Sequence, residues 1–241
     1  MIAESNPVPA SAKTERRAPV LQIGPLKLVG PAALVVAFVL LLAIGWLLWW
    51  FRGPLGGWPM GVSLAMWIVF IVYWSAAAKT AAPTKSSESV ESRRVHVRLM
   101  NGAYLLLFLP VVWLRGRYLP DAPVLVPVGL LVQAASGGLA VWARRHLGRN
   151  WSGAITVAVD HRLVRSGPYR VVRHPIYSAM LGMFAGTAIV SGEWHALAAV
   201  VLIAIAYARK IRLEEASLRS AFGAEYDEYR RASWALVPGV F

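Results

Sequence analysis

Six apolar stretches, separated by polar connections, constrain the fold of this chain more than any other feature of its sequence. They run at about 28–51, 60–78, 99–114, 124–143, 176–191 and 194–208. Most of them approach the roughly 20 residues that an α-helix needs to cross a bilayer. The pattern predicts an all-α polytopic membrane protein with about six transmembrane or membrane-embedded helices, of which the last two form a helical hairpin.

The composition and the placement of charge support a membrane protein. Of the 241 residues, 57% are hydrophobic and 15% are charged, which is outside the range of soluble globular domains. The net charge of +13 follows the predicted topology, because every Lys and Arg except Arg52, Arg115 and Arg117 falls on one side. We therefore expect an integral multi-pass protein of a bacterial inner (cytoplasmic) membrane, with both termini cytoplasmic.

Several classes of function are disfavoured. Basic and aromatic residues are not interleaved on a polar surface, so the charge does not indicate a nucleic-acid partner. The chain has no cysteine, which excludes thiolate metal sites and a cysteine nucleophile. His146, His161 and His195 have no partners at metal-ligand spacing, so we expect no metal. The first four apolar stretches lack acidic residues, which disfavours an ion-coupled carrier.

The sequence divides into three regions. Residues 1–20 are predicted to be a flexible cytoplasmic tail, 21–143 the N-terminal transmembrane helices, and 144–241 a cytoplasmic C-terminal region that binds a cofactor and carries the chemistry. Within the fourth apolar stretch, Gln133 and Ser136 are expected to serve helix packing and interhelical hydrogen bonds. The run 154–159 is β-prone, and Gly223 is expected to end a helix.

Two polar clusters flank the last apolar hairpin. Arg173-His174-Pro175 precedes it, and Glu214-Glu215 follows it. Proline is tolerated in the first turn of a helix, so the span is predicted to begin at Ile176 with the arginine and histidine outside it. The hairpin brings both clusters to one face, where His174 and Tyr177 are expected to face Glu214 across a cavity sized for a cofactor. Ionisable groups at a membrane boundary indicate a functional site.

The C-terminal region resembles a known family over about residues 145–238. The resemblance lies in the ordered set Leu163-Val164, Gly167-Pro168-Tyr169, Arg173-His174-Pro175-Ile176-Tyr177, Glu214-Glu215-Ala216-Ser217-Leu218 and Phe222–Tyr229. This set is similar to that of the isoprenylcysteine carboxyl methyltransferase family, in its bacterial branch. One departure is Ala179, where the family commonly has glycine, and its methyl group puts the local cofactor geometry or helix packing in doubt.

The resemblance implies S-adenosylmethionine as cofactor and a lipophilic acceptor that enters from the membrane. It places eight residues in the cofactor pocket: Leu163, Val164, Gly167, Tyr169, His174, Pro175, Tyr177 and Glu214. It also suggests Arg173 and Glu215 as catalytic groups near the acceptor.

The residue types suit such a cofactor. A sulfonium amino acid calls for an acidic group at its ammonium, an Arg or His donor at its carboxylate and an aromatic face. A carboxylate acceptor, such as that of a prenylcysteine, needs no base. An amine-headed lipid or a thiol must lose a proton, which makes His174, Glu215 or Tyr177 candidate bases. The sequence leaves the acceptor open.

Two alternative functions and one alternative interpretation of the charged residues are retained. A membrane reductase of the sterol reductase kind shares the Arg-His-Pro-x-Tyr step and uses a nicotinamide cofactor, but it typically carries Arg-Asp and a later cysteine where this chain has Glu214-Glu215. A non-enzymatic scaffold or carrier would place the function in the apolar half. A third description treats Arg173 and His174 as topogenic and pairs Glu214 and Glu215 with Arg212 and Arg219 on a solvated helix.

Overall fold

A computed structural model describes residues 20–23, 26–29, 39, 58–78, 88–109, 111–114, 116–148, 151 and 163–239. The chain forms two compact units, Met1–Phe38 and Val39–Phe241. In the first, strands β1 (Val20–Ile23) and β2 (Leu26–Val29) pair antiparallel, with Val20 opposite Val29. This hairpin was not predicted, although Gly24-Pro25 is a turn signal between two short runs that are mostly apolar. Most of the predicted tail and first span, and the run 154–159, lie outside the described residues.

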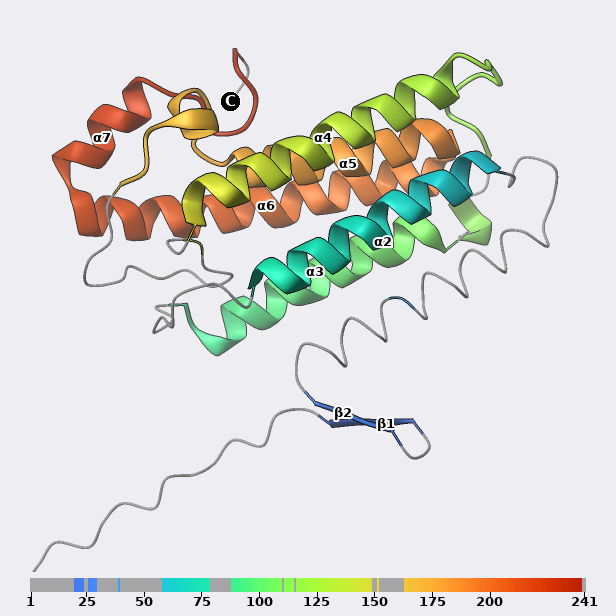
Figure 1. The fold of residues 1–241 in the computed structure, drawn as a ribbon, viewed down its shortest axis with the longest axis horizontal. Coiled ribbons are helices and arrows are strands. Elements are labelled where there is room, and N and C mark those ends of the chain that lie inside the picture. The colour runs from blue at the N-terminus through green and yellow to red at the C-terminus, as the bar shows by residue number, and fades with distance from the viewer. Residues whose placement is uncertain are drawn as a thin grey trace, which may run out of the picture. The chain divides into compact units, whose positions relative to one another are not determined.

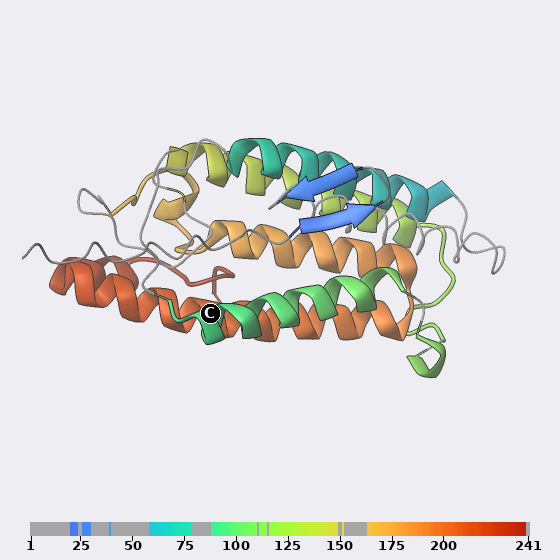
Figure 2. The same cartoon turned by 90° about the horizontal axis from the view of Figure 1, so that it is seen from below.

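The second unit is helical in its described part. Its helices are α2 (Trp58–Ala78), α3 (Val90–Phe108), α4 (Leu125–Leu147), α5 (Pro175–Ser191), α6 (Trp194–Phe222) and α7 (Ala224–Arg231), with short 3-10 turns η1 (Val112–Leu114) and η3 (Gly167–Arg170). The five long helices run alongside one another, α4 against α5, α3 against α6, and α5 against α6 (Figures 1 and 2). Helix α7 lies beyond the end of this bundle (Figure 1).

The helix lengths differ from the predicted spans at two places. Helix α3 starts at Val90 rather than near residue 99, because Ser89 caps it and accepts a hydrogen bond from the Ser92 N–H at 3.2 Å. Helix α6 continues beyond residue 208 to Phe222, so the second polar cluster lies on the same helix as the last apolar stretch. Among the described helices, α2 and α4 are long and apolar enough to cross a membrane, and α5 is apolar but shorter. Six spans remain a prediction.

Small residues bring α4 and α5 into close contact. A Cβ atom at Gly186 would lie 2.6 Å from the carbonyl oxygen of Gly129, and one at Gly182 would lie 2.1 Å from Ser136 Oγ. The clash at Gly186 is with backbone and cannot be relieved without moving a helix, so this position requires glycine. At Gly182 the Ser136 side chain would have to move. The predicted role of Ser136 in helix packing is confirmed.

The core of the bundle contains a polar group of side chains inside an aromatic one. Ser63 Oγ donates to Gln133 Oε1 at 2.7 Å, Gln133 Nε2 donates to the Ser63 carbonyl at 2.9 Å, and Trp67 Nε1 donates to Thr187 Oγ1 at 2.9 Å. The Trp67 ring packs edge-on against Phe184, with centroids 5.3 Å apart. Each of these four polar side chains thus has a partner on another helix, and the expected interhelical role of Gln133 is confirmed.

The turn of the last hairpin is short. Gly192 ends α5 in the left-handed region, at φ +67°, and its N–H donates to the Ala188 carbonyl at 2.8 Å. Glu193 then leads directly into α6. Because so few residues separate the two helices, α5 and α6 pack antiparallel, and the start of α5 lies beside the charged half of α6.

Candidate active site

The segment before α5 is shaped by its glycine and prolines. Gly167 opens η3 at φ +59°, a conformation that other residues rarely adopt. Pro175 occupies the first turn of α5, where a missing N–H costs no helical hydrogen bond, and it is fully buried. His174 is the residue immediately before the helix, at φ −121° and ψ 58°. Arg173 and His174 thus lie at the helix entrance, as the sequence predicts.

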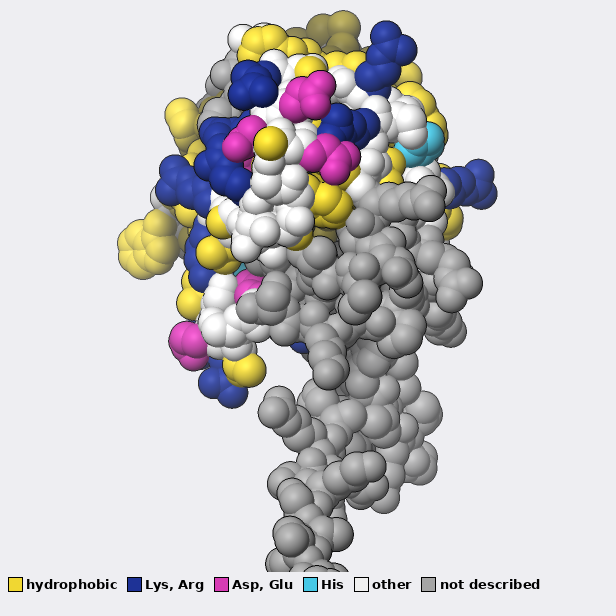
Figure 3. Space-filling model, turned by 90° about the vertical axis from the view of Figure 1, so that its left-hand side faces the viewer, with side chains coloured by type: hydrophobic (Ala, Val, Ile, Leu, Met, Phe, Trp, Pro, Cys, Tyr) yellow, Lys and Arg dark blue, Asp and Glu magenta, His cyan; other side chains and the backbone are white. Residues whose placement is uncertain are grey.

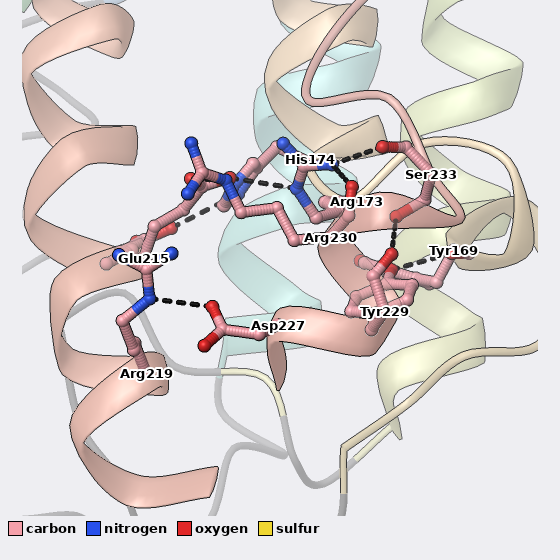
Figure 4. A network of polar contacts seen from close by, with 10 residues as sticks. Tyr169, Arg173, His174, Glu215, Arg219, Asp227, Tyr229, Arg230 and Ser233 are labelled. Atoms are coloured by element: carbon pink, nitrogen blue, oxygen red, sulfur yellow. Dashed lines mark hydrogen bonds and ion pairs between the residues drawn. The ribbon is translucent and has the colours of Figure 1, made fainter. Parts of the chain in front are cut away.

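The two polar clusters meet at one end of the hairpin (Figure 4). Arg173 Nε donates to Glu215 Oε1 at 2.9 Å. His174 lies between both carboxylates, with Nδ1 3.5 Å from Glu214 Oε2 and Nε2 3.4 Å from Glu215 Oε1. The Tyr177 hydroxyl donates to Glu214 Oε1 at 2.5 Å. We call Arg173, His174, Tyr177, Glu214 and Glu215 the His174 cluster.

This geometry corrects two expectations. His174 and Tyr177 contact Glu214 directly, whereas the sequence predicted that they face it across a cavity. Antiparallel helices joined by a short turn bring long side chains within hydrogen-bond distance, which explains the difference. Arg219 pairs with Asp227 at 2.8 Å instead of with Glu214 or Glu215. The description of these glutamates as members of a solvated helix face is therefore wrong, since Glu215 pairs with Arg173 at 2.9 Å.

The segment after α7 runs along the helix entrance and completes the cluster. The backbone N–H of Arg173 donates to the Trp234 carbonyl at 2.8 Å, and that of His174 donates to the Ala235 carbonyl at 3.1 Å. Arg173 Nη1 also donates to the carbonyls of Arg230, at 3.1 Å, and Ser233. Residues 233–235 thus hold the arginine and histidine in place through their backbone carbonyls.

Charge in the cluster is strongly coupled. Burial disfavours the charged form of His174, but hydrogen bonds to Glu214 and Glu215 outweigh it and raise the pKa of His174 above 6.5. Burial disfavours charge on Glu215 as well, yet His174 and Arg173 lower the pKa of that carboxyl to about 2. The histidine is thus biased towards its cationic form between two carboxylates.

The remaining predicted site residues lie close by but outside this cluster. Tyr169 stacks on His146 with centroids 6.4 Å apart, and its backbone carbonyl accepts from the Tyr229 hydroxyl at 2.6 Å. Burial raises the pKa of Tyr229 to about 12, so its hydroxyl remains a donor at neutral pH. Gly167 lies against the His146 ring. Leu163 and Val164 are partly buried on the segment that leads into η3.

Several residues of the site were not identified from the sequence. Ser233, Trp234 and Ala235 contribute through backbone carbonyls, which carry no side-chain signature. Arg230 lies 3.7 Å from Glu215 and was not predicted as a site residue. The surface around α7 carries both basic and acidic side chains (Figure 3), so charge alone did not single it out.

Ala179, the noted departure from the family pattern, is 1% exposed and packs in the hydrophobic core of the bundle. Its methyl group therefore contributes to helix packing. It is not among the side chains that contact the carboxylates of the His174 cluster in the described structure.

Comparisons with known proteins match the region that contains this cluster. Residues 124–225 match the model of the phospholipid methyltransferase family. The matched range contains the whole His174 cluster and both helices of its hairpin. Over these residues the chain is thus similar to a family of phospholipid methyltransferases.

Several curated proteins are similar to part of the chain. The chain is 33% identical over 96 residues to a probable protein-S-isoprenylcysteine O-methyltransferase of Oryza sativa subsp. indica and to protein-S-isoprenylcysteine O-methyltransferase B of Arabidopsis thaliana. These matches cover 39% of this chain and 50% and 49% of the relatives. The cobalt-zinc-cadmium resistance protein CzcN of Cupriavidus metallidurans is 38% identical over 95 residues, 38% of this chain and 43% of that protein. The chain thus spans about half the length of the curated relatives it matches.

A solved structure shares the fold. It is described as the eukaryotic intramembrane Ras methyltransferase ICMT (isoprenylcysteine carboxyl methyltransferase) without a monobody. The match has a TM-score of 0.53 with 19% identity, and it covers 87% of this chain and 76% of the other. At this identity the likeness shows a common helical membrane fold.

Proposed function

We propose that this protein transfers a methyl group from S-adenosylmethionine to a lipophilic acceptor at the end of the bundle that carries the His174 cluster. The observation that supports the proposal most is that acidic, cationic and aromatic groups meet there within contact distance, inside the region that matches a methyltransferase family. The catalytic region is residues 144–241, and we propose that it lies at the cytoplasmic face of a bacterial inner membrane.

The donor set fits the cofactor. Glu214 would bind the ammonium group and the Nη2 atom of Arg173 would bind the carboxylate. His174 would keep both in position through its contacts with Glu214 and Glu215. Arg173 uses Nε and Nη1 for Glu215 and the backbone, and no hydrogen bond engages Nη2 within the described residues. The Tyr177 hydroxyl, which donates to Glu214, would hold that carboxylate in place for the ammonium group. Leu163, Val164, Gly167, Tyr169 and Pro175 would line the rest of the pocket.

When bound, S-adenosylmethionine supplies an electrophilic methyl group on a positively charged sulfur. The protein's own task is to hold the acceptor in line with that group and to exclude water. Arg173 and Glu215 are proposed to contribute near the acceptor, with Glu215 fixing the arginine through its ion pair. The acceptor is a membrane-soluble amphiphile, with a carboxylate, an amine or a thiol as the methylated group.

The proposal is tested by supplying S-adenosylmethionine with a labelled methyl group to the protein in nanodiscs, together with a lipid extract of the host. We expect label in the organic phase, inhibited by S-adenosylhomocysteine and absent for Glu214→Gln. Oxidation of NADPH without transfer of label would instead support a reductase. Equal label with wild type and Glu214→Gln would refute the assigned site.

A further inference from the structure

A column of four aromatic rings links the His174 cluster to α3. The His174 and Tyr177 rings stack with centroids 5.6 Å apart, and the Tyr177 and Tyr207 rings stack at 4.6 Å. The Tyr207 ring then contacts His96 at 6.2 Å. The column therefore runs from the entrance of α5, across α6, to α3. It brings a second histidine from a distant part of the sequence to the far side of the site.

His96 is surrounded by charged groups of both signs. Lys210, Glu88, Glu214 and Arg209 all act on it electrostatically. Lys210 Nζ lies 2.9 Å from Glu88 Oε2, and Arg209 Nη2 donates to Ser92 Oγ at 2.9 Å. These contacts hold the first turns of α3 against α6. On α6 they lie about one helical turn before Glu214. The position of His96 relative to Glu214 is thus set by the packing of both helices.

His96 differs from His174 in its hydrogen bonding. Each ring nitrogen of His174 lies within 3.5 Å of a carboxylate. The Nδ1 atom of His96 is buried and has no hydrogen-bond partner among the described residues. An imidazole nitrogen in this state can keep a lone pair and accept a proton. A buried nitrogen without a partner also carries a desolvation cost, which a ligand with an N–H or S–H group would relieve.

The other candidate bases are engaged. Glu215 accepts from Arg173 and has a pKa lowered to about 2, so it is a weak base. Glu214 accepts from the Tyr177 hydroxyl, and both glutamates flank His174. Among the described residues on the α3 and α6 side of the cluster, His96 presents a buried imidazole nitrogen without a hydrogen-bond partner.

We propose that His96 is the proton acceptor for an amphiphile that is methylated on an amine or a thiol. This inference rests on the proposed function and specifies its acceptor class. The lone pair of the acceptor nitrogen or sulfur forms the new bond to the methyl carbon. The carbon–sulfur bond of the sulfonium donor breaks, and its electron pair stays on sulfur as a neutral thioether. The acceptor's proton passes to Nδ1 of His96 and then to water.

The test uses three amphiphiles with the same chain length, dodecylamine, dodecanethiol and dodecanoate, with the full protein in nanodiscs. We expect His96→Gln to lower the methylation rate of dodecylamine or dodecanethiol by about 100-fold, because general bases contribute on that scale. The rate of the wild type should rise with pH through a single ionisation that the variant lacks. Arg94→Gln is the control, since Arg94 lies on the same helix and is exposed.

A second readout does not depend on turnover. With ¹³C-labelled histidine, the resonance that disappears in His96→Gln identifies His96 in the wild type. It should shift on addition of dodecylamine or dodecanethiol, and remain unchanged with dodecanoate. The affinity of His96→Gln for S-adenosylhomocysteine should stay within about twofold of the wild type, which shows that the variant is folded.

The outcomes separate this inference from the proposed function. If the wild type binds S-adenosylhomocysteine but methylates only dodecanoate, or none of the three probes, the role of His96 is refuted and cofactor binding stands. Unchanged rates for His96→Gln with an amine or thiol probe also refute it. If the wild type does not bind S-adenosylhomocysteine, the proposed function itself fails.

Discussion

At the scale of single residues, the His174 cluster combines groups that are costly to bury separately. Arg173 and His174 have side chains that are 8% and 7% exposed, and Glu215 is 17% exposed. A buried charge is tolerated when it is paired and hydrogen-bonded, which is the case for each of them. Removing one member leaves its partners without compensation, so these residues should affect both stability and ligand binding.

Glu214→Gln separates binding from folding. The amide keeps the shape of the side chain and can still accept from Tyr177, but it cannot neutralise an ammonium group. We expect affinity for S-adenosylhomocysteine to fall by at least about tenfold, which corresponds to 1.4 kcal/mol. Isothermal titration calorimetry measures this change. Glu91→Gln on the exposed start of α3 is the matched control and should bind like the wild type. Equal affinities for both variants would contradict the assignment of Glu214.

The stability of the protein should depend on pH through His174. The pKa of His174 is raised in the folded state, so its contribution to stability is complete below the unfolded value of 6.5 and is lost as the pH rises through the folded value. The difference in unfolding free energy between wild type and His174→Gln should therefore shrink as the pH is raised above 6.5. Denaturant titrations in detergent at several pH values measure it. A difference that grows with pH would contradict this account.

The contribution of Glu215 to stability has the opposite pH dependence. Its folded pKa is lowered from 4.5 to about 2, so its contribution is present above 4.5 and is lost only as the pH falls towards 2. Between pH 5 and 6.5, both groups should therefore stabilise the fold at once.

At the scale of helices, the contact between α4 and α5 determines where the site is placed. Helix α5 carries His174 at its start, and its position depends on glycines that permit close approach to α4. A displaced α5 would move His174 away from α6 and its glutamates. Packing in the middle of the bundle thus supports geometry at its end.

Gly186→Ala tests this dependence. The added methyl group would lie 2.6 Å from the Gly129 carbonyl, so we expect a loss of stability of about 1–3 kcal/mol, typical of overpacking. Gly138→Ala is the matched control, because a methyl group there meets nothing within 4 Å. The control should be neutral or slightly stabilising, since alanine favours a helix. Thermal unfolding of both variants in the same detergent measures the difference in stability. Equal melting temperatures would contradict the claim that Gly186 is needed for close packing.

The sequence predicted the helix entrance well because proline leaves a local signature. Pro175, and the glutamates at the end of an apolar run, could be located from residue types alone. The contacts that hold Arg173 could not be predicted, because Ser233 and Trp234 act through backbone carbonyls whose partners depend on the path of the chain after α7. The start of α3 was also missed, since its first turns are polar and lie outside the apolar pattern.

At the scale of the whole molecule, apolar side chains cover the outside of the bundle as well as its core. Val69 in the middle of α2 and Leu131 on α4 are both 69% exposed. An apolar surface that extends over several helices is unfavourable in water and favourable in contact with lipid. The exposed apolar side chains therefore support a membrane environment for these helices.

The free-energy cost of placing a charge on this apolar surface should depend on how deep the residue lies in the membrane. Val69→Asp places a carboxylate near the middle of α2 and should disfavour insertion by about 2.5–3.5 kcal/mol. Trp58→Asp is similar in exposure, at 68%, but lies at the first residue of the helix, so its cost should be much smaller. Glycosylation mapping of α2 insertion compares them. Equal insertion of both variants would contradict a membrane-spanning α2.

The central claim is that Arg173, His174, Glu214 and their neighbours bind S-adenosylmethionine. The measurement that tests it most directly is calorimetric titration of the purified protein with S-adenosylhomocysteine and, separately, with NADPH. We predict micromolar binding of S-adenosylhomocysteine that is lost in His174→Ala and Glu214→Gln, and no binding of NADPH. Micromolar binding of NADPH alone would contradict the account.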